Sequence, residues 1–275
     1  PVRLVEIGPG DGTLMSDMLR AARLAPEFLA AADLWLVETS EPLRRLQAER
    51  LASAAPHWAS SLDEVASGAP LLVVANELLD CLPARQFVRT DEGWAERLVG
   101  LGEAGELAFG LSKSPADQAL PEAGIGAVFE QSAAQGAFGD AVGYRLAADG
   151  GAALLIDYGR DAPDFGDTLQ ALRRHQKVDP LDCPGEADLT VHVDFPAVMA
   201  AAARSGAAST IRTQREFLLS LGLAQRAQLL AAAQPAKADA IERQFDRLVG
   251  EDQMGLLFKA CCLHQKGLAV PGFEP

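Results

Sequence analysis

The chain has 275 residues, of which 49% are hydrophobic, and a formal net charge of −14. This length and apolar content fit one large domain with a sizeable core, and they argue against disorder. The acidic balance argues against nucleic acid as a partner, because phosphates are bound by basic surfaces, and it suits either a cationic partner or an ordinary solubilising surface.

Targeting signals and cysteine pairs are missing from the sequence. No apolar run reaches the length of a membrane span and no signal peptide is visible, so we expect a cytoplasmic protein, or one of the mitochondrial matrix in a eukaryote. Because Pro1 stands almost directly on a strand pattern, we expect further residues before it in the natural protein. Four cysteines at positions 81, 183, 261 and 262 form no C-x-x-C pair, so neither a disulfide framework nor a zinc site is expected.

Strands and helices alternate through the first part of the chain. Val2–Ile7 is a buried-strand pattern, a glycine turn follows, and apolar residues then repeat at helical spacing from Leu14 to Ala22. Residues 33–38 form a second strand, after which Ser40 is a candidate N-cap for a helix. A further strand covers residues 71–75. Alternation of this kind predicts an α/β fold with a parallel sheet.

Residues 85–125 interrupt the alternation with short strands and turns, which indicates an antiparallel meander inserted into a domain made of residues 1–84 and 126–275. An Ala-rich helix between Phe129 and Leu146 leads to a strand at residues 152–156. Residues 160–195 read as a long irregular segment. Three helices follow, beginning at Asp194, at a Thr213–Glu216 capping box and at Pro235, and residues 256–263 read as a last strand.

The turn after the first strand has the pattern G-x-G-x-G, formed by Gly8, Gly10 and Gly12 with Pro9 between the first two. Glycines allow the backbone to turn sharply and to approach a ligand closely. A dinucleotide fingerprint would place a small residue where Thr13 stands. The carboxylate of Glu6, two residues before the loop, suits the ammonium group of a methionine moiety. The loop therefore favours S-adenosyl-L-methionine over a dinucleotide.

Two further positions complete the expected cofactor site. Glu38 ends the second strand beside the glycine loop, where a carboxylate can accept hydrogen bonds from both ribose hydroxyls. The alternative is an exposed acid at a strand end. Ser61 and Leu62 follow the third predicted strand and are expected to border the adenine.

Polar residues also follow the later strands. Asn76 and Glu77 stand at the end of the strand at residues 71–75, and Asp157 ends the strand at residues 152–156. Ligands of parallel sheets bind outside the carboxyl ends of the strands, so these residues are candidates for the acceptor site. Alternatively Asn76 is a turn residue, and Asp80 is a helix cap.

His192 and Asp194 lie on one face if their segment is extended, because they are two residues apart. His192 is either a base or a buried histidine with satisfied hydrogen bonds, and Asp194 is either a site residue or the N-cap of a helix. A metal site would need a third ligand at compatible spacing, and none stands out.

Five blocks of sequence together resemble the MidA family of class I S-adenosylmethionine-dependent methyltransferases. They read V-E-I-G-P-G-D-G-T-L-M at residues 5–15, V-E-T-S at 37–40, A-N-E-L-L-D-C-L-P at 75–83, L-I-D-Y-G at 155–159 and P-G-E-A-D-L-T-V-H-V-D-F at 184–195. One residue departs from the family pattern: Asp11 stands where the family usually has Arg. A negative charge there is expected to oppose binding of the methionine carboxylate.

The resemblance implies a Rossmann-like seven-stranded sheet with C-terminal helices, and additional N-terminal helices that help to close the site. It also implies transfer of a methyl group to an arginine side chain of a protein with a basic segment, since one family member is a mitochondrial arginine methyltransferase that assists assembly of respiratory complex I. We expect Glu77 and Asn76, with Asp157, to orient the guanidinium, and His192 or Asp194 to accept the proton.

Two alternatives remain at this point. An NAD(P)-dependent oxidoreductase has a similar fold, although Thr13 and Glu6 count against it. A non-catalytic assembly protein would keep the fold without turnover, and Asp11 keeps that alternative open.

Overall fold

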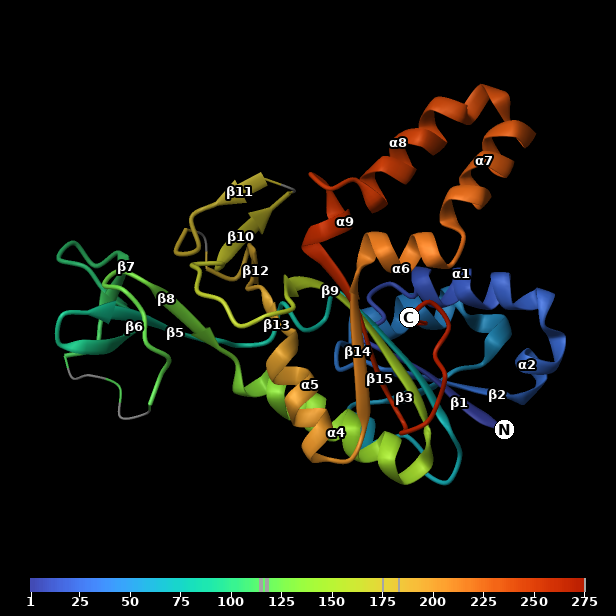
Figure 1. The fold of residues 1–275 in the computed structure, drawn as a ribbon, viewed down its shortest axis with the longest axis horizontal. Helices are drawn as coiled ribbons and strands as arrows, with labels where there is room; N and C mark the ends of the chain where they lie inside the picture. Colours follow the sequence, from blue (N-terminus) through green and yellow to red (C-terminus); the bar gives the residue numbers. More distant parts are fainter. Residues whose placement is uncertain (114–115, 117–118, 175, 183, 275) are drawn as a thin grey trace.

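The structure is a computed structural model that describes residues 1–113, 116, 119–174, 176–182 and 184–274, so Cys183 lies outside the described residues. Its centre is a sheet with the strand order β14-β15-β9-β4-β1-β2-β3 (Figure 1). The bounds of these strands are β1 Val2–Ile7, β2 Ala32–Val37, β3 His57–Ala59, β4 Leu71–Asn76, β9 Gly151–Arg160, β14 Ala208–Thr213 and β15 Phe258–His264. The predicted seven-stranded α/β sheet is confirmed, and the two-residue strand β13 (Val193–Asp194) adds to the end of β9.

The topology places the ends of β1 and β4 next to each other. All neighbouring pairs along this path are parallel except those that β15 makes with β9 and β14. From β1 the chain moves outward to β2 and β3, then returns to β4 on the other side. Ligands of open α/β sheets bind at such a reversal of strand order, outside the carboxyl ends of the strands.

Helices cover both faces of the sheet. On one face α1 (Thr13–Ala21) and α3 (Glu41–Arg50) pack over β1 and β2, with α2 (Pro26–Ala31) beside them. On the other face α4 (Ala133–Asp149) and α5 (Phe195–Arg204) pack over the core that β1, β4, β9 and β15 share. Glycine permits the close approach of α4 to α5, since a Cβ on Gly139 would stand 2.4 Å from the carbonyl oxygen of Val198.

The inserted meander is a separate antiparallel sheet with the order β7-β6-β5-β8. Its strands are β5 (Arg85–Thr90), β6 (Gly93–Leu101), β7 (Leu107–Leu111) and β8 (Val128–Gln131). The short antiparallel strands expected here are present, and β8 joins them from beyond residue 125. Because Phe129 belongs to β8, the Ala-rich helix begins later than predicted, at Ala133, where the side chain of Ser132 caps it.

The segment 160–195 is not irregular as predicted. It contains a three-stranded antiparallel sheet of β10 (Gln170–Arg173), β11 (Gln176–Val178) and β12 (Asp188–Thr190). Strands of three or four residues give too few alternations to stand out in a sequence. This small sheet lies between the β5–β8 sheet and the C-terminal helices (Figure 1).

The C-terminal helices outnumber the three that were predicted. After α5 come α6 (Gln214–Ser220), α7 (Leu223–Ala233), α8 (Ala238–Val249) and the short α9 (Met254–Leu257), which takes two residues assigned to the last strand. The capping box at Thr213 and Glu216 is confirmed. The prediction missed α7, because none of its residues is buried and it therefore has no sharp apolar stripe. Short 3-10 turns occupy Ala22–Leu24, Ala52–Ala54, Leu62–Glu64 and Pro235–Lys237.

Candidate active site

The glycine loop connects β1 to α1 through a left-handed backbone. Gly8, Gly10 and Gly12 all have positive φ angles, of 70°, 52° and 81°, a region that other residues adopt only at a cost. The N–H of Gly12 donates to the carbonyl of Pro9 over 2.8 Å, and Gly12 is the N-cap of α1. A Cβ on Gly8 would stand 2.7 Å from Cδ1 of Leu78, so the loop also packs against the segment that follows β4.

Glu6 is a buried carboxylate with an unused oxygen. The residue is 2% exposed, and its Oε2 has no hydrogen-bond partner among the described residues. Burial raises the pKa of Glu6 to about 7, and the charge of Asp11 adds to the rise, while the backbone N–H of Met15 opposes it. A buried carboxylate with one unpartnered oxygen at the base of a glycine loop fits the ammonium group of S-adenosyl-L-methionine.

The carboxylate of Asp11, which was expected to oppose cofactor binding, is already paired within the protein. Its Oδ1 accepts the backbone N–H of Thr13 over 3.0 Å, and its Oδ2 lies 2.9 Å from Nη1 of Arg50. The hydrogen bonds from Thr13, and then Arg50, lower the pKa of Asp11. The expected cost of a negative charge in the loop is therefore offset by a cation that α3 supplies.

Glu38 lies just past the end of β2, where a hydrogen-bonded network fixes it. Its Oε1 accepts the backbone N–H of Ser40 over 2.7 Å. Ser40 is the N-cap residue of α3, as the sequence predicts, although its side chain makes no cap hydrogen bond. Nε2 of Gln47 lies 3.4 Å from Oε2 of Glu38 and donates to the carbonyl of Gly10 over 2.7 Å. Trp58 donates to Oε1 of Gln47 over 2.9 Å.

Gln47 is thus the residue that joins Glu38 to the glycine loop, and it is fully buried. No sequence pattern pointed to Gln47, because a glutamine on a helix is ordinarily a solvent-facing residue. Only the folded arrangement shows that this face of α3 lies against the glycine loop.

Ser61 and Leu62 follow β3, as the sequence predicts. Ser61 is exposed, whereas Leu62 is 8% exposed and packs into the core that lies over β4 and α4. The carbonyl of Leu62 accepts a hydrogen bond from Nη1 of Arg145 over 2.7 Å. Of this pair, Ser61 has the side chain that is open to solvent.

Glu77 follows β4 with a left-handed backbone, at a φ of 49°. Its N–H donates to the carbonyl of Ile156 over 2.9 Å, and its Oε1 lies 3.3 Å from Nδ2 of Asn76. Left-handed residues other than glycine are uncommon and cluster at functional sites. Glu77 is exposed, so the fold holds its carboxylate at the carboxyl edge of the sheet and open to solvent.

Asp157 is a buried acceptor that shapes the turn after Glu77. Its Oδ2 accepts the backbone N–H groups of Leu79 and Asp80 over 2.9 and 3.2 Å, and its Oδ1 accepts that of Tyr158. Burial, together with the charge of Asp80, raises the pKa of Asp157 to about 7. Its contacts are therefore with the protein backbone, and it acts on any ligand through the turn.

Asp80 is not a helix cap, because no helix follows it. It is 6% exposed and shares a hydrogen bond with the hydroxyl of Tyr158, while burial raises the pKa of Asp80. Its carbonyl accepts the N–H of Val191, which ties the turn after β4 to the segment that carries His192. In the sequence, only the position of Asp80 within the N-E-L-L-D block marked it as a candidate for the site.

His192 and Asp194 have different surroundings. The His192 ring packs edge-on against Tyr158 with ring centroids 5.6 Å apart, and burial lowers the pKa of His192, which leaves the imidazole neutral at pH 7. Asp194 caps α5 by accepting the N–H of Ala197 and pairs with Arg160 over 2.5 Å. His192 therefore joins the cluster around Asp80, and Asp194 positions the start of α5.

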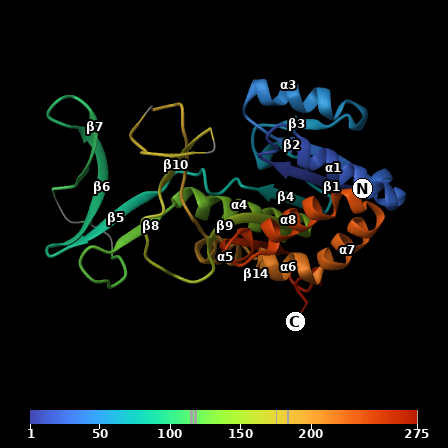
Figure 2. The same cartoon turned by 90° about the horizontal axis from the view of Figure 1, so that it is seen from above.

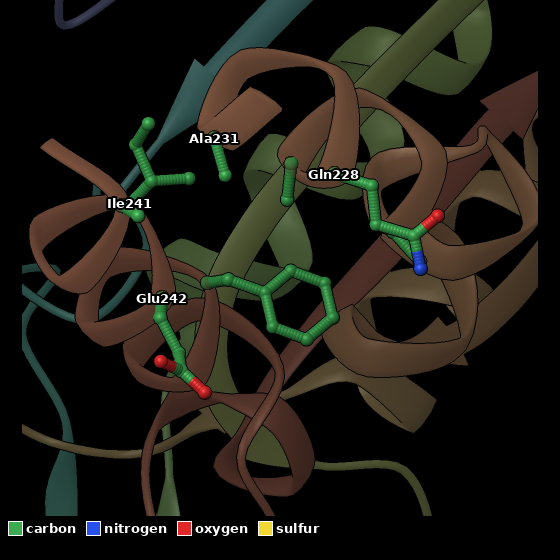
Figure 3. Close-up of a pocket in the computed structure, with 8 residues that line it drawn as sticks. Gln228, Ala231, Ile241 and Glu242 are labelled. Carbon is green, nitrogen blue, oxygen red and sulfur yellow. The ribbon is translucent and has the colours of Figure 1, made fainter. Parts of the chain in front are cut away.

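A cavity of about 250 Å³ lies elsewhere, between α7 and α8 (Figure 3). Its lining includes Ile241, Phe245 and Glu242 and none of the predicted site residues.

Within the described residues, no group of three or more side chains is placed to hold a metal ion. None of the helices in the described part of the chain has the length and the apolar content that a membrane span requires. Cys261 and Cys262 are buried in β15 as small apolar residues.

A family of known proteins matches most of this chain. Residues 1–213 match the model of a family described as S-adenosyl-L-methionine-dependent methyltransferases. The chain belongs to this family. S-adenosyl-L-methionine is its cofactor, and Glu6, the glycine loop and Glu38 fit that molecule.

Relatives extend the match over the rest of this methyltransferase. It is 32% identical to the mitochondrial protein arginine methyltransferase NDUFAF7 of Danio rerio, over 94% of this chain and 68% of the relative, and 30% identical to that of Homo sapiens, over 96% and 67%. A Burkholderia thailandensis structure bound to S-adenosyl-homocysteine is 29% identical, with a TM-score of 0.81, over 99% of this chain and 72% of the other.

Proposed function

We propose that this methyltransferase transfers the methyl group to an arginine side chain in a basic segment of an acceptor protein. The relatives named as protein arginine methyltransferases support this acceptor. The net charge of −14 is compatible with it, since an acidic enzyme attracts a cationic segment. The resemblance to the MidA family further implies a role in assembly of respiratory complex I.

The observation that carries this proposal is the exposed carboxylate of Glu77, held in a left-handed conformation beside Asn76. Leu78, the next residue, touches the glycine loop, so the turn after β4 and the cofactor loop are in contact. A guanidinium is best bound by a carboxylate that accepts two N–H bonds at once. We infer that Glu77 binds the acceptor guanidinium and that Asn76 orients the Glu77 carboxylate.

The other predicted residues have supporting roles in this mechanism. When bound, the cofactor supplies an electrophilic methyl group on a sulfonium. Glu6, Gly8, Pro9, Gly10, Gly12 and Glu38 hold the cofactor, and Ser61 borders its adenine with the backbone of Leu62. Asp157 fixes the turn that follows β4, and Asp194 fixes the start of α5. Both of these segments face the acceptor. His192, neutral at pH 7 because of its lowered pKa, accepts the proton that the guanidinium loses.

Two alternative functions agree less well with these observations. An NAD(P)-dependent oxidoreductase does not agree with the family to which the chain belongs. A non-catalytic assembly protein would bind S-adenosyl-L-methionine without transfer. The pairing of Asp11 with Arg50 removes the main reason to prefer that rival.

Replacement of Glu77 tests the acceptor site. We expect E77Q to reduce kcat/KM for the acceptor about tenfold to a hundredfold, because a charged hydrogen bond contributes about 1.5–3 kcal/mol. The Kd for S-adenosyl-L-methionine, measured by calorimetry, should stay the same. E242Q changes an exposed glutamate on α8 and is the matched control. Unchanged transfer by E77Q would exclude the role given to Glu77.

The acceptor and the location follow from the same proposal. We propose a protein acceptor reached in the cytoplasm of a bacterium or in the mitochondrial matrix of a eukaryote. The relatives of Danio rerio and Homo sapiens are mitochondrial, which supports the second location for a eukaryotic protein.

A further inference from the structure

The strand β7 forms an open edge of the inserted sheet. Within the described residues it pairs only with β6, and Figures 1 and 2 both show the β6–β7 hairpin at the end of the molecule away from α7 and α8. An edge strand presents a row of backbone groups that can pair with another strand.

The hydrogen bonds at the two ends of β7 show which of its residues face the open edge. The N–H of Gly102 donates to Glu106, and the N–H of Ser112 donates to Glu96. Residues two apart in an antiparallel pair repeat this direction, so Ala108 and Gly110 turn their backbone groups to β6. Leu107, Phe109 and Leu111 therefore present their N–H and C=O groups outward.

The side chains of these three outward residues are apolar and open to solvent. Leu107 is 38% exposed, Phe109 41% and Leu111 47%. The strand Leu107–Leu111 contains no charged residue and no proline, which are the devices that natural proteins use to protect an edge. An unprotected apolar edge on a strongly acidic protein indicates a surface that another strand covers.

The pattern of the strand identifies that other strand. Leu-Ala-Phe-Gly-Leu reads large, small, large, small, large in both directions, with Phe109 at its centre. We propose that β7 pairs antiparallel with β7 of a second copy of this chain, about a two-fold axis at Phe109. Such an interface requires each residue to suit its own counterpart. Leu107 of one copy then faces Leu111 of the other, and about six backbone hydrogen bonds form.

The charges at the two ends of β7 agree with this direction. Glu103 and Glu106 stand at its beginning and Lys113 just past its end. Lys113 has no ion-pair partner within the described residues. Antiparallel pairing centred on Phe109 brings Lys113 of each copy opposite Gly105 of the other, between the two glutamates. A parallel arrangement would bring like charges together.

Light scattering coupled to gel filtration, over a concentration series, tests the pairing. We expect the wild-type protein to reach twice its mass of 29.0 kDa. F109K should remain a monomer, because two lysines would meet at the axis. L229K places the same residue at an exposed apolar position on α7, where Leu229 is 72% exposed, and should stay a dimer. A wild-type protein that remains monomeric, or an F109K dimer, would overturn the pairing.

Charge reversal gives a second test that does not depend on the folding of F109K. K113E should raise the dimer Kd about threefold to tenfold, as expected for the loss of exposed ion pairs. The combined variant E103K/E106K/K113E restores opposite charges across the axis and should return the Kd to near the wild-type value. Equal dimer Kd values for wild type and K113E, or no recovery in the combined variant, would contradict the antiparallel arrangement. Pairing only with a strand of a different protein would also contradict it.

Discussion

Glu6 makes the stability of this protein depend on pH. Its folded pKa of about 7 lies above its ordinary value of 4.5, so the folded state binds more protons than the unfolded state between these values. The stability from this difference is fully present below pH 4.5 and is lost as the pH rises through 7. A shift of this size corresponds to a change in the free energy of unfolding on the order of 3 kcal/mol across this pH range.

We therefore expect E6Q to flatten the fall in Tm between about pH 5 and pH 8, measured by calorimetry without cofactor. The curve should still fall, because the raised pKa of Asp157 acts in the same direction and remains in this variant. D157N is the complementary variant, which keeps the contribution of Glu6. Parallel curves for wild type and E6Q would show that Glu6 is ionised throughout this range.

Gly8 and Gly10 allow a matched comparison within the loop. Both have positive φ, but a Cβ on Gly8 meets Leu78 at 2.7 Å, whereas nothing lies within 4 Å of a Cβ on Gly10. G10A should lose about 1–2 kcal/mol from its backbone alone. G8A should lose more and should also raise the Kd for S-adenosyl-L-methionine, because Leu78 and the turn after β4 must move. Thermal unfolding and calorimetry measure both effects, and equal losses would remove the contact as a cause.

At the scale of an element, α3 supports the cofactor site through Gln47. The amide donates to Gly10 and accepts from Trp58, and it is fully buried. Q47A should cost about 1–3 kcal/mol, because it leaves buried polar groups without partners, and it should weaken cofactor binding. E49A, at an exposed position of the same helix, is the control. If Q47A and E49A bind the cofactor equally well, α3 does not act through Gln47.

The sequence predicts elements well where burial imposes a pattern. The strands β1, β4 and β9 are continuous apolar runs, so their identity follows from composition, although β9 continues to Arg160, beyond the predicted end at residue 156. The helix α7 and the strands β10–β12 were missed because they are short or largely exposed, and such elements depend on neighbours that are distant in sequence. The cap at Asp194 was found because it depends on a local contact.

Some residues of the candidate site could likewise be predicted from the sequence, and others could not. The glycine loop, Glu6, Glu38 and Glu77 stand at ends of predicted strands, which topology alone brings to one edge. Gln47 and the bond between Asp80 and Tyr158 could not be predicted, because each depends on side chains packed across elements. The fate of Asp11 likewise depends on Arg50, nearly forty residues away in the chain.

For the molecule as a whole, the proposed cofactor site and the proposed acceptor site lie at one sheet edge and are in contact. The glycine loop follows β1, the carboxylate of Glu77 that we propose to bind the acceptor follows β4, and Leu78 packs against Gly8 between them. The chain enters the β5–β8 sheet shortly after this turn. Because the acceptor turn leads into the inserted sheet, we expect that sheet to lie on the acceptor side of the enzyme.

The most direct measurement is the transfer of an isotope-labelled methyl group from S-adenosyl-L-methionine to the proteins of a cell lysate, with the modified residue mapped by mass spectrometry. We predict label on an arginine nitrogen within a basic segment, and its loss with E77Q. Label on another residue type would contradict the arginine acceptor. Tight cofactor binding with no label on any protein would contradict transfer to a protein altogether.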